Sequence, residues 1–293
     1  MSAASLFSQF MSGLSTAMLL FLIASGLSLV FGVMRVINFA HGSFYMLGAY
    51  IAWQFVHWLQ PAGGVFWLAV LGAAAGVAVL GLAVERLFFR YLYGREELYQ
   101  LLFTYALVLI LGDAARFLWG TQQLSVSRPP VLAGGFEVFG TQIPAYNVFI
   151  MLIGPVIALL VWLMLTRTTP GRMVRAAALD REMLGALGAN VGWLYTGMFA
   201  LASFLAGLSG ALVTPIQSIV PGMDVEIIVQ AFIVVVIGGL GSFWGTFLGS
   251  VIYGQVLSFG ILVFPGFSLF SVFALMAVIL ILRPWGLLGR PLR

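Results

Sequence analysis

Long apolar runs separated by short polar breaks make up most of the chain. Runs of about 20 apolar residues suit helices that cross a bilayer. They cover residues 14–33, 42–59, 64–84, 99–118, 147–166, 192–213, 227–240, 245–264 and 268–282. The pattern predicts an all-α, polytopic integral membrane protein with about eight or nine transmembrane helices. The run at 227–240 is short and ends in glycines, so we expect a broken or partial span there.

The break after the first run is unusually polar for its position. It reads Arg35-Val-Ile-Asn38-Phe-Ala-His41-Gly42-Ser43 and lies between two long apolar runs. Unsatisfied polar groups in lipid cost several kcal/mol each. The break is therefore expected at a membrane face, or facing a protein-lined or aqueous path. We predict that Asn38, His41, Gly42 and Ser43 belong to a substrate pathway or hinge.

A second candidate for the pathway or hinge is rich in glycine. It comprises Gly238, Gly239, Gly241 and Gly245, and Gly249 continues a stripe of small residues. Such stripes let helix backbones approach closely in lipid, so tight helix packing is one interpretation and a pore lining or moving interface is the other. Gly-Ser-Phe occurs at 42–44 and at 241–243, a match too short to predict a repeat.

Composition supports the membrane assignment. The 293 residues are 62% hydrophobic and 8% charged, whereas soluble domains carry about 25% charged residues. The length suits one transmembrane domain over residues 1–293. All 13 basic residues are Arg. Placing the segments around 35, 86–95, 167–181 and 283–293 on one side gathers every Arg there except Arg116 and Arg128. The positive-inside rule then predicts an external N-terminus and a cytoplasmic C-terminus.

Two segments between the runs have recognisable patterns. Residues 120–145 form the largest predicted external loop, and 136–143 alternate around a glycine, which predicts a small hairpin. Residues 167–191 are the most hydrophilic internal stretch, and good helix formers fill 173–187. We expect a short cytoplasmic helix beside the membrane there. It is either a docking helix for a soluble partner or a solvated loop held by lipid headgroups.

The ionisable residues and motifs do not predict an enzyme. A phosphate-binding loop needs a Lys, and the chain has none. The sequence Gly207-Leu-Ser-Gly210 has the form of an intramembrane serine protease motif, but both His residues lie far upstream of it. No ligand cluster predicts a metal site. We expect Glu85 to anchor its helix at the interface and Asp113 and Arg116 to pair. Asp224 and Glu226 are expected in a solvated outer loop; the alternative is that, together with Gln230, they meet an incoming solute.

The stretch Gly26–Tyr50 closely resembles the signature of the branched-chain amino acid ABC permeases of the LivH type. Residues 84–90, 170–175, 187–190, 236–246 and 283–291 fit the same family in order. The resemblance implies a bacterial inner-membrane permease paired with a second, homologous permease. It also implies two cytoplasmic subunits that bind ATP and Mg, and a periplasmic or lipid-anchored solute-binding protein. Neither a cofactor nor nucleic acid is expected on this chain, and lipid surrounds it.

The resemblance also makes residues 167–191 the segment that couples to the ATPase. The expected coupling residues are Gly171, Arg172, Arg175, Asp180, Arg181 and Glu182. The E-A-A-x-x-x-G pattern of many ABC importers is missing from this loop. Expected solutes are branched-chain or other hydrophobic amino acids, or related small solutes such as urea or short amides. The alternative is a stand-alone ion-coupled transporter or channel, which would need a mid-membrane carboxylate, and none is clearly placed there.

Overall fold

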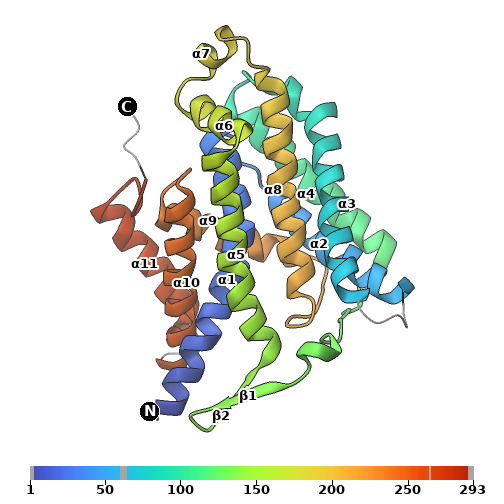
Figure 1. The fold of residues 1–293 in the computed structure, drawn as a ribbon, viewed down its shortest axis with the longest axis vertical. Coiled ribbons are helices and arrows are strands. Elements are labelled where there is room, and N and C mark those ends of the chain that lie inside the picture. The colour runs from blue at the N-terminus through green and yellow to red at the C-terminus, as the bar shows by residue number, and fades with distance from the viewer. Residues whose placement is uncertain (1–2, 60–64, 264, 290–293) are drawn as a thin grey trace.

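The computed structural model describes residues 3–59, 65–263 and 265–289 and is almost entirely helical (Figure 1). Within these residues, nine apolar helices overlap the predicted runs, although the first and the seventh begin earlier than expected, and positions 64 and 264 lie outside the described residues. They are α1 (Ala3–Met34), α2 (Ala40–Leu59), α3 (Val65–Leu87), α4 (Glu97–Trp119), α5 (Ala145–Arg167), α8 (Val191–Val213), α9 (Met223–Gly238), α10 (Phe243–Val263) and α11 (Ser268–Leu282). The all-α, polytopic prediction is confirmed.

Short helices and a hairpin lie at the two ends of this bundle. The short helices α6 (Thr169–Leu179) and α7 (Arg181–Ala186) lie at one end, which we call the α6–α7 end. At the opposite end, the hairpin end, β1 (Gly135–Val138) pairs with β2 (Thr141–Pro144). The turn residues Phe139 and Gly140 both have positive φ, which suits the twist of a two-residue hairpin turn. The predicted hairpin is therefore present.

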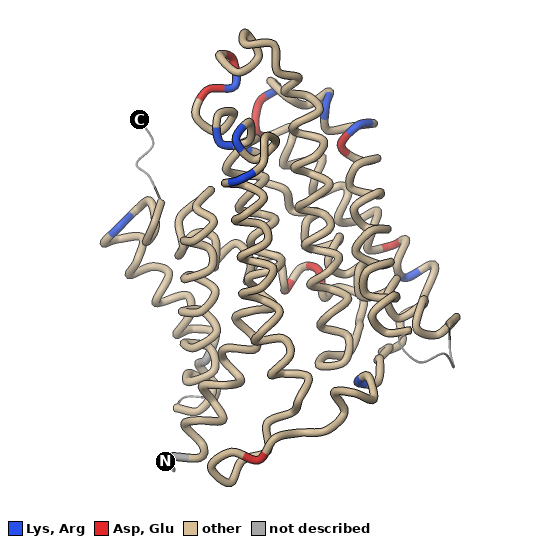
Figure 2. The backbone as a smooth tube through the Cα atoms, in the orientation of Figure 1, with Lys and Arg blue, Asp and Glu red and all other residues tan. Residues whose placement is uncertain are grey.

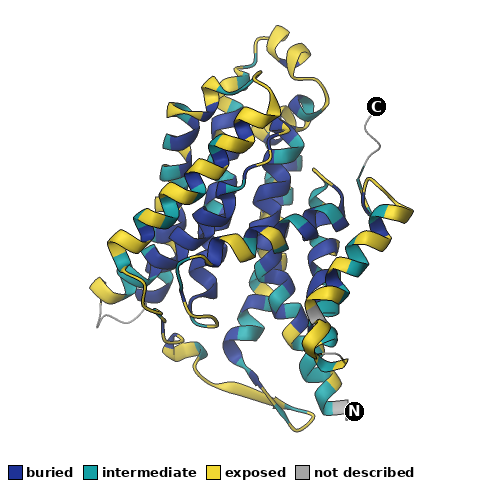
Figure 3. Ribbon diagram, turned by 180° about the vertical axis from the view of Figure 1, so that it is seen from behind, coloured by how far each residue is buried: buried dark blue, intermediate teal, exposed yellow. Residues whose placement is uncertain are grey.

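The central helices are buried and the outer ones are not (Figure 3). Helices α1 and α8 pack against one another, and α2, α3, α9 and α10 surround them. Helices α4, α5 and α11 lie at the periphery and expose large apolar side chains, among them Phe117 and Ile281. Among the described residues, six helices are long and apolar enough to cross a membrane, and α2, α9 and α11 are not among them. The exposed apolar belt fits a bundle surrounded by lipid.

The bundle contains two series of helices with matching packing, α1–α4 and α8–α11. Helix α1 packs against α10 as α8 packs against α3, and α2 packs on α8 as α9 packs on α1. Because α1 runs toward the α6–α7 end and α8 runs away from it (Figure 1), the series have opposite directions. This is the arrangement of an inverted repeat. The Gly-Ser-Phe tripeptides are not equivalent in it, since one opens α2 and the other precedes α10.

Both α2 and α9 begin inside the bundle. The ring Nε2 of His41, in the first turn of α2, lies 3.0 Å from the carbonyl oxygen of Ile23. Ile23 is eleven residues before the end of α1, which corresponds to about 16 Å. The chain therefore turns back into the protein after α1. The break begins at the exposed Arg35 near the α6–α7 end, and its later residues, Asn38 to Ser43, face a protein-lined interior. Helix α9 has 16 residues, about 24 Å, which is shorter than the hydrocarbon core of about 30 Å and fits a partial span.

Glycines set the closest helix contacts. A Cβ on Gly48 of α2 would overlap the backbone of Gly207 in α8, and a Cβ on Gly245 of α10 would overlap Gly238 of α9. Helices that approach this closely gain van der Waals contact that a larger side chain would prevent. The packing interpretation of Gly245 and Gly249 is thus the one the structure supports directly, because Gly249 also lies against α9, at Val234.

Candidate functional site

The first turns of α2 and α9 meet inside the bundle. The Ser43 hydroxyl donates a 2.8 Å hydrogen bond to the Asp224 carboxylate. A Cβ on Gly42 would overlap the Asp224 carbonyl oxygen, so the two chain segments touch. Ser43 is fully buried and Asp224 is 3% exposed. A carboxylate at the start of a helix is stabilised by the unpaired backbone N–H groups there. Asp224 lies in the first turn of α9 and against the first turn of α2.

The expectation that Asp224 and Glu226 lie in a solvated outer loop is wrong. Residues 214–222 run from the end of α8 into the bundle, and Ile219 pairs with Leu124 on the way. Asp224 consequently lies at the depth of the α2 N-terminus, halfway along the bundle, where Figure 2 shows an acidic stretch. A carboxylate halfway along the bundle does exist. Hydropathy missed it because two charges at the start of a short apolar run look like a loop boundary.

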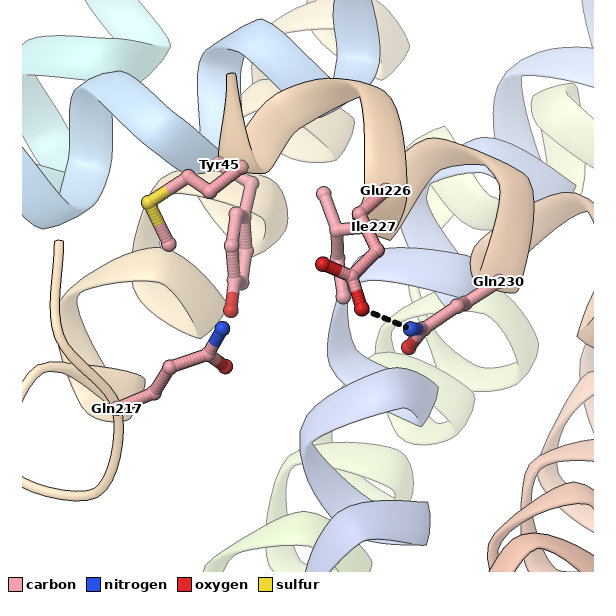
Figure 4. A pocket seen from close by; sticks show the side chains of 6 residues that line it. Tyr45, Gln217, Glu226, Ile227 and Gln230 are labelled. Carbon is pink, nitrogen blue, oxygen red and sulfur yellow. Dashed lines mark hydrogen bonds between the residues drawn. The ribbon is translucent and has the colours of Figure 1, made fainter. Parts of the chain in front are cut away.

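A small pocket opens beside the first turn of α9 (Figure 4). Its lining residues are Tyr45, Gln217, Met223, Glu226, Ile227 and Gln230. The Gln230 amide donates a 3.1 Å hydrogen bond to the Glu226 carboxylate. Tyr45 and Gln217 point toward one another from α2 and from the segment after α8. The pocket thus joins three chain segments. Of its lining residues, the sequence suggested only Glu226 and Gln230, as groups that could meet an incoming solute.

The two predicted pathway groups are not brought together. Asn38, His41, Gly42 and Ser43 are all buried near the starts of α2 and α9. Among the described residues, neither amide atom of the Asn38 side chain has a hydrogen-bond partner. The glycine group lies at the other end of α9. There Gly239 packs against Gly289, and Gly241 packs against Gly32 of α1, both with positive φ.

The predicted coupling segment folds as two capped helices. The Thr168 hydroxyl accepts a hydrogen bond from the backbone N–H of Gly171, and the Asp180 carboxylate accepts from those of Glu182 and Met183. These are N-cap bonds, which satisfy N–H groups that a helix leaves unpaired. Gly171 is buried against α5, since a Cβ there would overlap Leu165. Asp180 is thus a structural cap as well as a surface charge.

The outer face of α6 and α7 is exposed and mixed in character. The exposed charged residues are Arg172, Arg175, Asp180, Arg181 and Glu182, and the exposed apolar ones are Met173, Leu179, Met183 and Leu187. Met183 is among them because the turn at Asp180 directs it outward. A cleft of about 250 Å³ separates residues 177–182 from Val33, Met34 and Arg35 at the end of α1. The segment therefore projects from the bundle while remaining next to the α1–α2 break.

Glu85 is not the interfacial anchor that the sequence suggested. It is 1% exposed and accepts hydrogen bonds from the Thr196 hydroxyl at 2.6 Å and the Tyr93 hydroxyl at 2.8 Å. The neighbouring Arg86 lies over the ring of Trp193. These contacts join the end of α3 to the start of α8. The predicted Asp113–Arg116 pair is present at 3.0 Å and exposed.

The serine protease interpretation finds no support in the geometry. The Ser209 hydroxyl donates to the carbonyl oxygen of Leu19, and the His41 ring faces Ile23 instead. Among the described residues, no three His, Asp or Glu side chains cluster as a metal site would require. Buried half-helices, a mid-depth carboxylate and an inverted repeat define instead the class of polytopic membrane permeases.

Comparison with known proteins identifies the family. The sequence model described as "Branched-chain amino acid transport system / permease component" matches residues 9–282. The chain belongs to this family. It is 30% identical over 295 residues to the high-affinity branched-chain amino acid transport system permease protein BraD of Pseudomonas aeruginosa, covering 97% of this chain and 95% of the relative.

Two further relatives come from Escherichia coli strain K12. The permease protein LivH of the corresponding system is 27% identical over 294 residues, covering 97% of this chain and 95% of LivH. The permease protein LivM is 27% identical over 299 residues, covering 92% of this chain and 68% of LivM. The resemblance inferred from Gly26–Tyr50 is confirmed.

Proposed function

We propose that this chain is the membrane-spanning permease subunit of an ABC importer that carries branched-chain or other hydrophobic amino acids across a bacterial inner membrane. The family match over residues 9–282 carries this proposal. The names of BraD and LivH supply the solute class. Urea and short amides are the competing solutes for an importer of this type.

Energy for transport is assigned to other subunits. The chain has no Lys and so cannot supply the lysine of a phosphate-binding loop. Two ATPase subunits would bind ATP and Mg, with none bound by this chain, and the exposed face of α6 and α7 would dock on them. Similarity to LivM as well as LivH supports a second, homologous permease as partner. A periplasmic or lipid-anchored binding protein would deliver the solute.

Charge distribution supports the orientation. Among the described residues, every Arg except Arg116 and Arg128 belongs to segments near the α6–α7 end, where Figure 2 shows most of the blue. Arg290 and Arg293 lie outside the described residues. The positive-inside rule makes this end cytoplasmic. The N-terminus would then be outside and the C-terminus inside.

The contacts suggest how docking reaches the pathway. Residues 177–182 lie across a cleft from the end of α1. From there the chain runs through the break at 35–39 to the first turn of α2, which contacts Asp224 of α9. Gly32 against Gly241 joins the same end of α1 to the α9–α10 turn. A movement of α6 and α7 would therefore shift the starts of both half-helices through packed elements.

One observation favours a second candidate, a stand-alone ion-coupled transporter. Asp224 supplies the mid-membrane carboxylate that such proteins use for coupling. This candidate predicts uptake by the purified chain alone, driven by a proton gradient. The importer predicts none.

The deciding experiment is tagged purification followed by transport. We expect mild detergent to recover a second permease and two ATPases with this chain, identified by mass spectrometry. The same complex in proteoliposomes, with its binding protein, should import leucine in an ATP-dependent manner and exclude urea. Leucine uptake that does not need ATP would refute the importer assignment.

A further inference from the structure

Glu226 lies where a carboxylate cannot face lipid. It occupies the first turn of α9, two residues after Asp224, at the depth of the α2 N-terminus. Its side chain is exposed. Exposing a carboxylate to lipid at the centre of a bilayer costs about 3 kcal/mol or more. This face of α9 is therefore covered by water or by another protein chain.

Within the described part of the chain, no cation forms an ion pair with Glu226. Among the described residues, the one ion pair is Asp113–Arg116 on α4. Among the same described residues, the only side chain that hydrogen-bonds to Glu226 is the neutral amide of Gln230. The carboxylate thus keeps the capacity to accept further hydrogen bonds, and a positively charged donor would use it best.

The other residues that line the pocket are partly polar and partly apolar. Gln217 and the Tyr45 hydroxyl add neutral hydrogen-bonding groups, and Met223 and Ile227 add apolar surface (Figure 4). Tyr45 is 2% exposed, and its hydroxyl points toward the Gln217 side chain (Figure 4). The pocket itself holds only about 30 Å³, so a second chain or a movement of α9 must complete it around a larger ligand.

We propose that this pocket is a solute-contact site on the translocation path, where Glu226 binds the ammonium group of a zwitterionic amino acid and Met223 and Ile227 contact its apolar side chain. The site faces the second permease across an aqueous path. This inference rests on the proposed importer function and names which part of the solute is recognised. It disfavours urea and short amides, which carry no cationic group.

The first test uses the absence of Cys from the chain. Gln230→Cys places a single thiol beside Glu226 in the intact complex, and Val79→Cys places one on the exposed outer face of α3. Only a thiolate reacts with methanethiosulfonates, so a thiol in lipid stays inert. We expect the Gln230 variant, with or without ATP, to label at least about tenfold faster than the Val79 variant. Equal rates would overturn the proposal.

Charge selectivity gives a sharper readout. We expect the Gln230 variant to prefer the cationic reagent over the anionic one by about tenfold, after correction for their rates with a free thiol in water. Adding Glu226→Gln should abolish that preference and leave labelling itself intact. A preference that persists without the carboxylate would show that Glu226 does not select cations.

Transport completes the test. Glu226→Gln keeps the shape of the side chain and should lower ATP-driven leucine uptake about tenfold or more, while partner recovery and ATP hydrolysis stay unchanged. The matched control Glu137→Gln, an exposed position of β1, should transport normally. Unchanged uptake in Glu226→Gln would overturn the site. Loss of ATP-driven uptake in the unmodified complex would instead refute the importer function, and the labelling results would stand separately.

Discussion

At the scale of single residues, the interior is specified by groups whose neighbours lie far away in the sequence. Gly48 and Gly207 are adjacent because α2 crosses α8 there, and Glu85 finds the hydroxyl of Thr196, 111 positions later. Neither pairing leaves a local signal. The sequence showed glycines and a lone carboxylate, and only packing explains why those residue types occupy those positions.

Gly48→Ala tests the closest of these contacts. The new methyl group would overlap the backbone of Gly207, which cannot rotate away as a side chain would. We expect a loss of about 1–3 kcal/mol in the free energy of unfolding, measured by thermal unfolding in detergent. Gly76→Ala is the matched control, because a Cβ on Gly76 has open space around it. Equal stability of the two variants would contradict the packing.

Thr196→Val tests the buried carboxylate. It removes one of two hydroxyls that hydrogen-bond to Glu85 and leaves the volume nearly unchanged. A buried group that loses such a partner costs about 1–3 kcal/mol, so we expect a lower unfolding temperature. The double variant Glu85→Gln with Thr196→Val should lose less stability than the sum of the losses in the two single variants, because both changes act on one hydrogen-bond network. Strict additivity would argue against that network.

At the scale of elements, the long helices followed from periodicity and length, and the short ones depend on caps. Helix α7 has only six residues, too few to be stable alone. Its start is fixed by the Asp180 carboxylate, which accepts from two backbone N–H groups. Helix propensity predicted a single helix across residues 173–187, and the cap explains why two form at an angle instead.

Asp180→Ala should loosen α7 specifically. Losing an N-cap costs about 0.5–2 kcal/mol, so we expect the amides of Glu182 and Met183 to exchange about 2- to 30-fold faster with solvent. Asp180→Asn keeps the cap and removes the charge, and it should exchange normally. Reduced ATPase recovery with the Asn variant would therefore assign a role in docking to the charge itself.

At the scale of the whole molecule, two helix series of opposite direction meet at half-helices that begin in the middle of the bundle. This places polar first turns where no lipid reaches them. It also leaves the Arg-rich segments at one end, where α6 and α7 project. The proposed orientation, partner docking and solute path thus depend on the arrangement and not on any one helix.

Thiol accessibility in intact cells checks the orientation. Met183→Cys in α7 and Gln142→Cys in β2 are both at exposed positions at opposite ends of the bundle. We expect an impermeant thiol reagent to label the Gln142 variant in intact cells, and to label the Met183 variant only after the membrane is opened. The reverse pattern would place α6 and α7 outside. The parent chain, which has no Cys, is the blank.

The sequence alone determined the membrane class, the nine apolar helices, the hairpin and the family, because length, hydropathy, turn chemistry and an ordered set of motifs are local properties of the chain. The tertiary structure decided what depends on depth and proximity. It moved Asp224 from an expected outer loop to the bundle centre, buried Glu85, separated the glycine group from Asn38–Ser43, and exposed Glu226. Hydropathy reports how apolar a segment is, but it cannot report that a chain turns back halfway through a bundle. The free-energy cost of a charge depends on where the folded chain places it, inside the protein or in lipid.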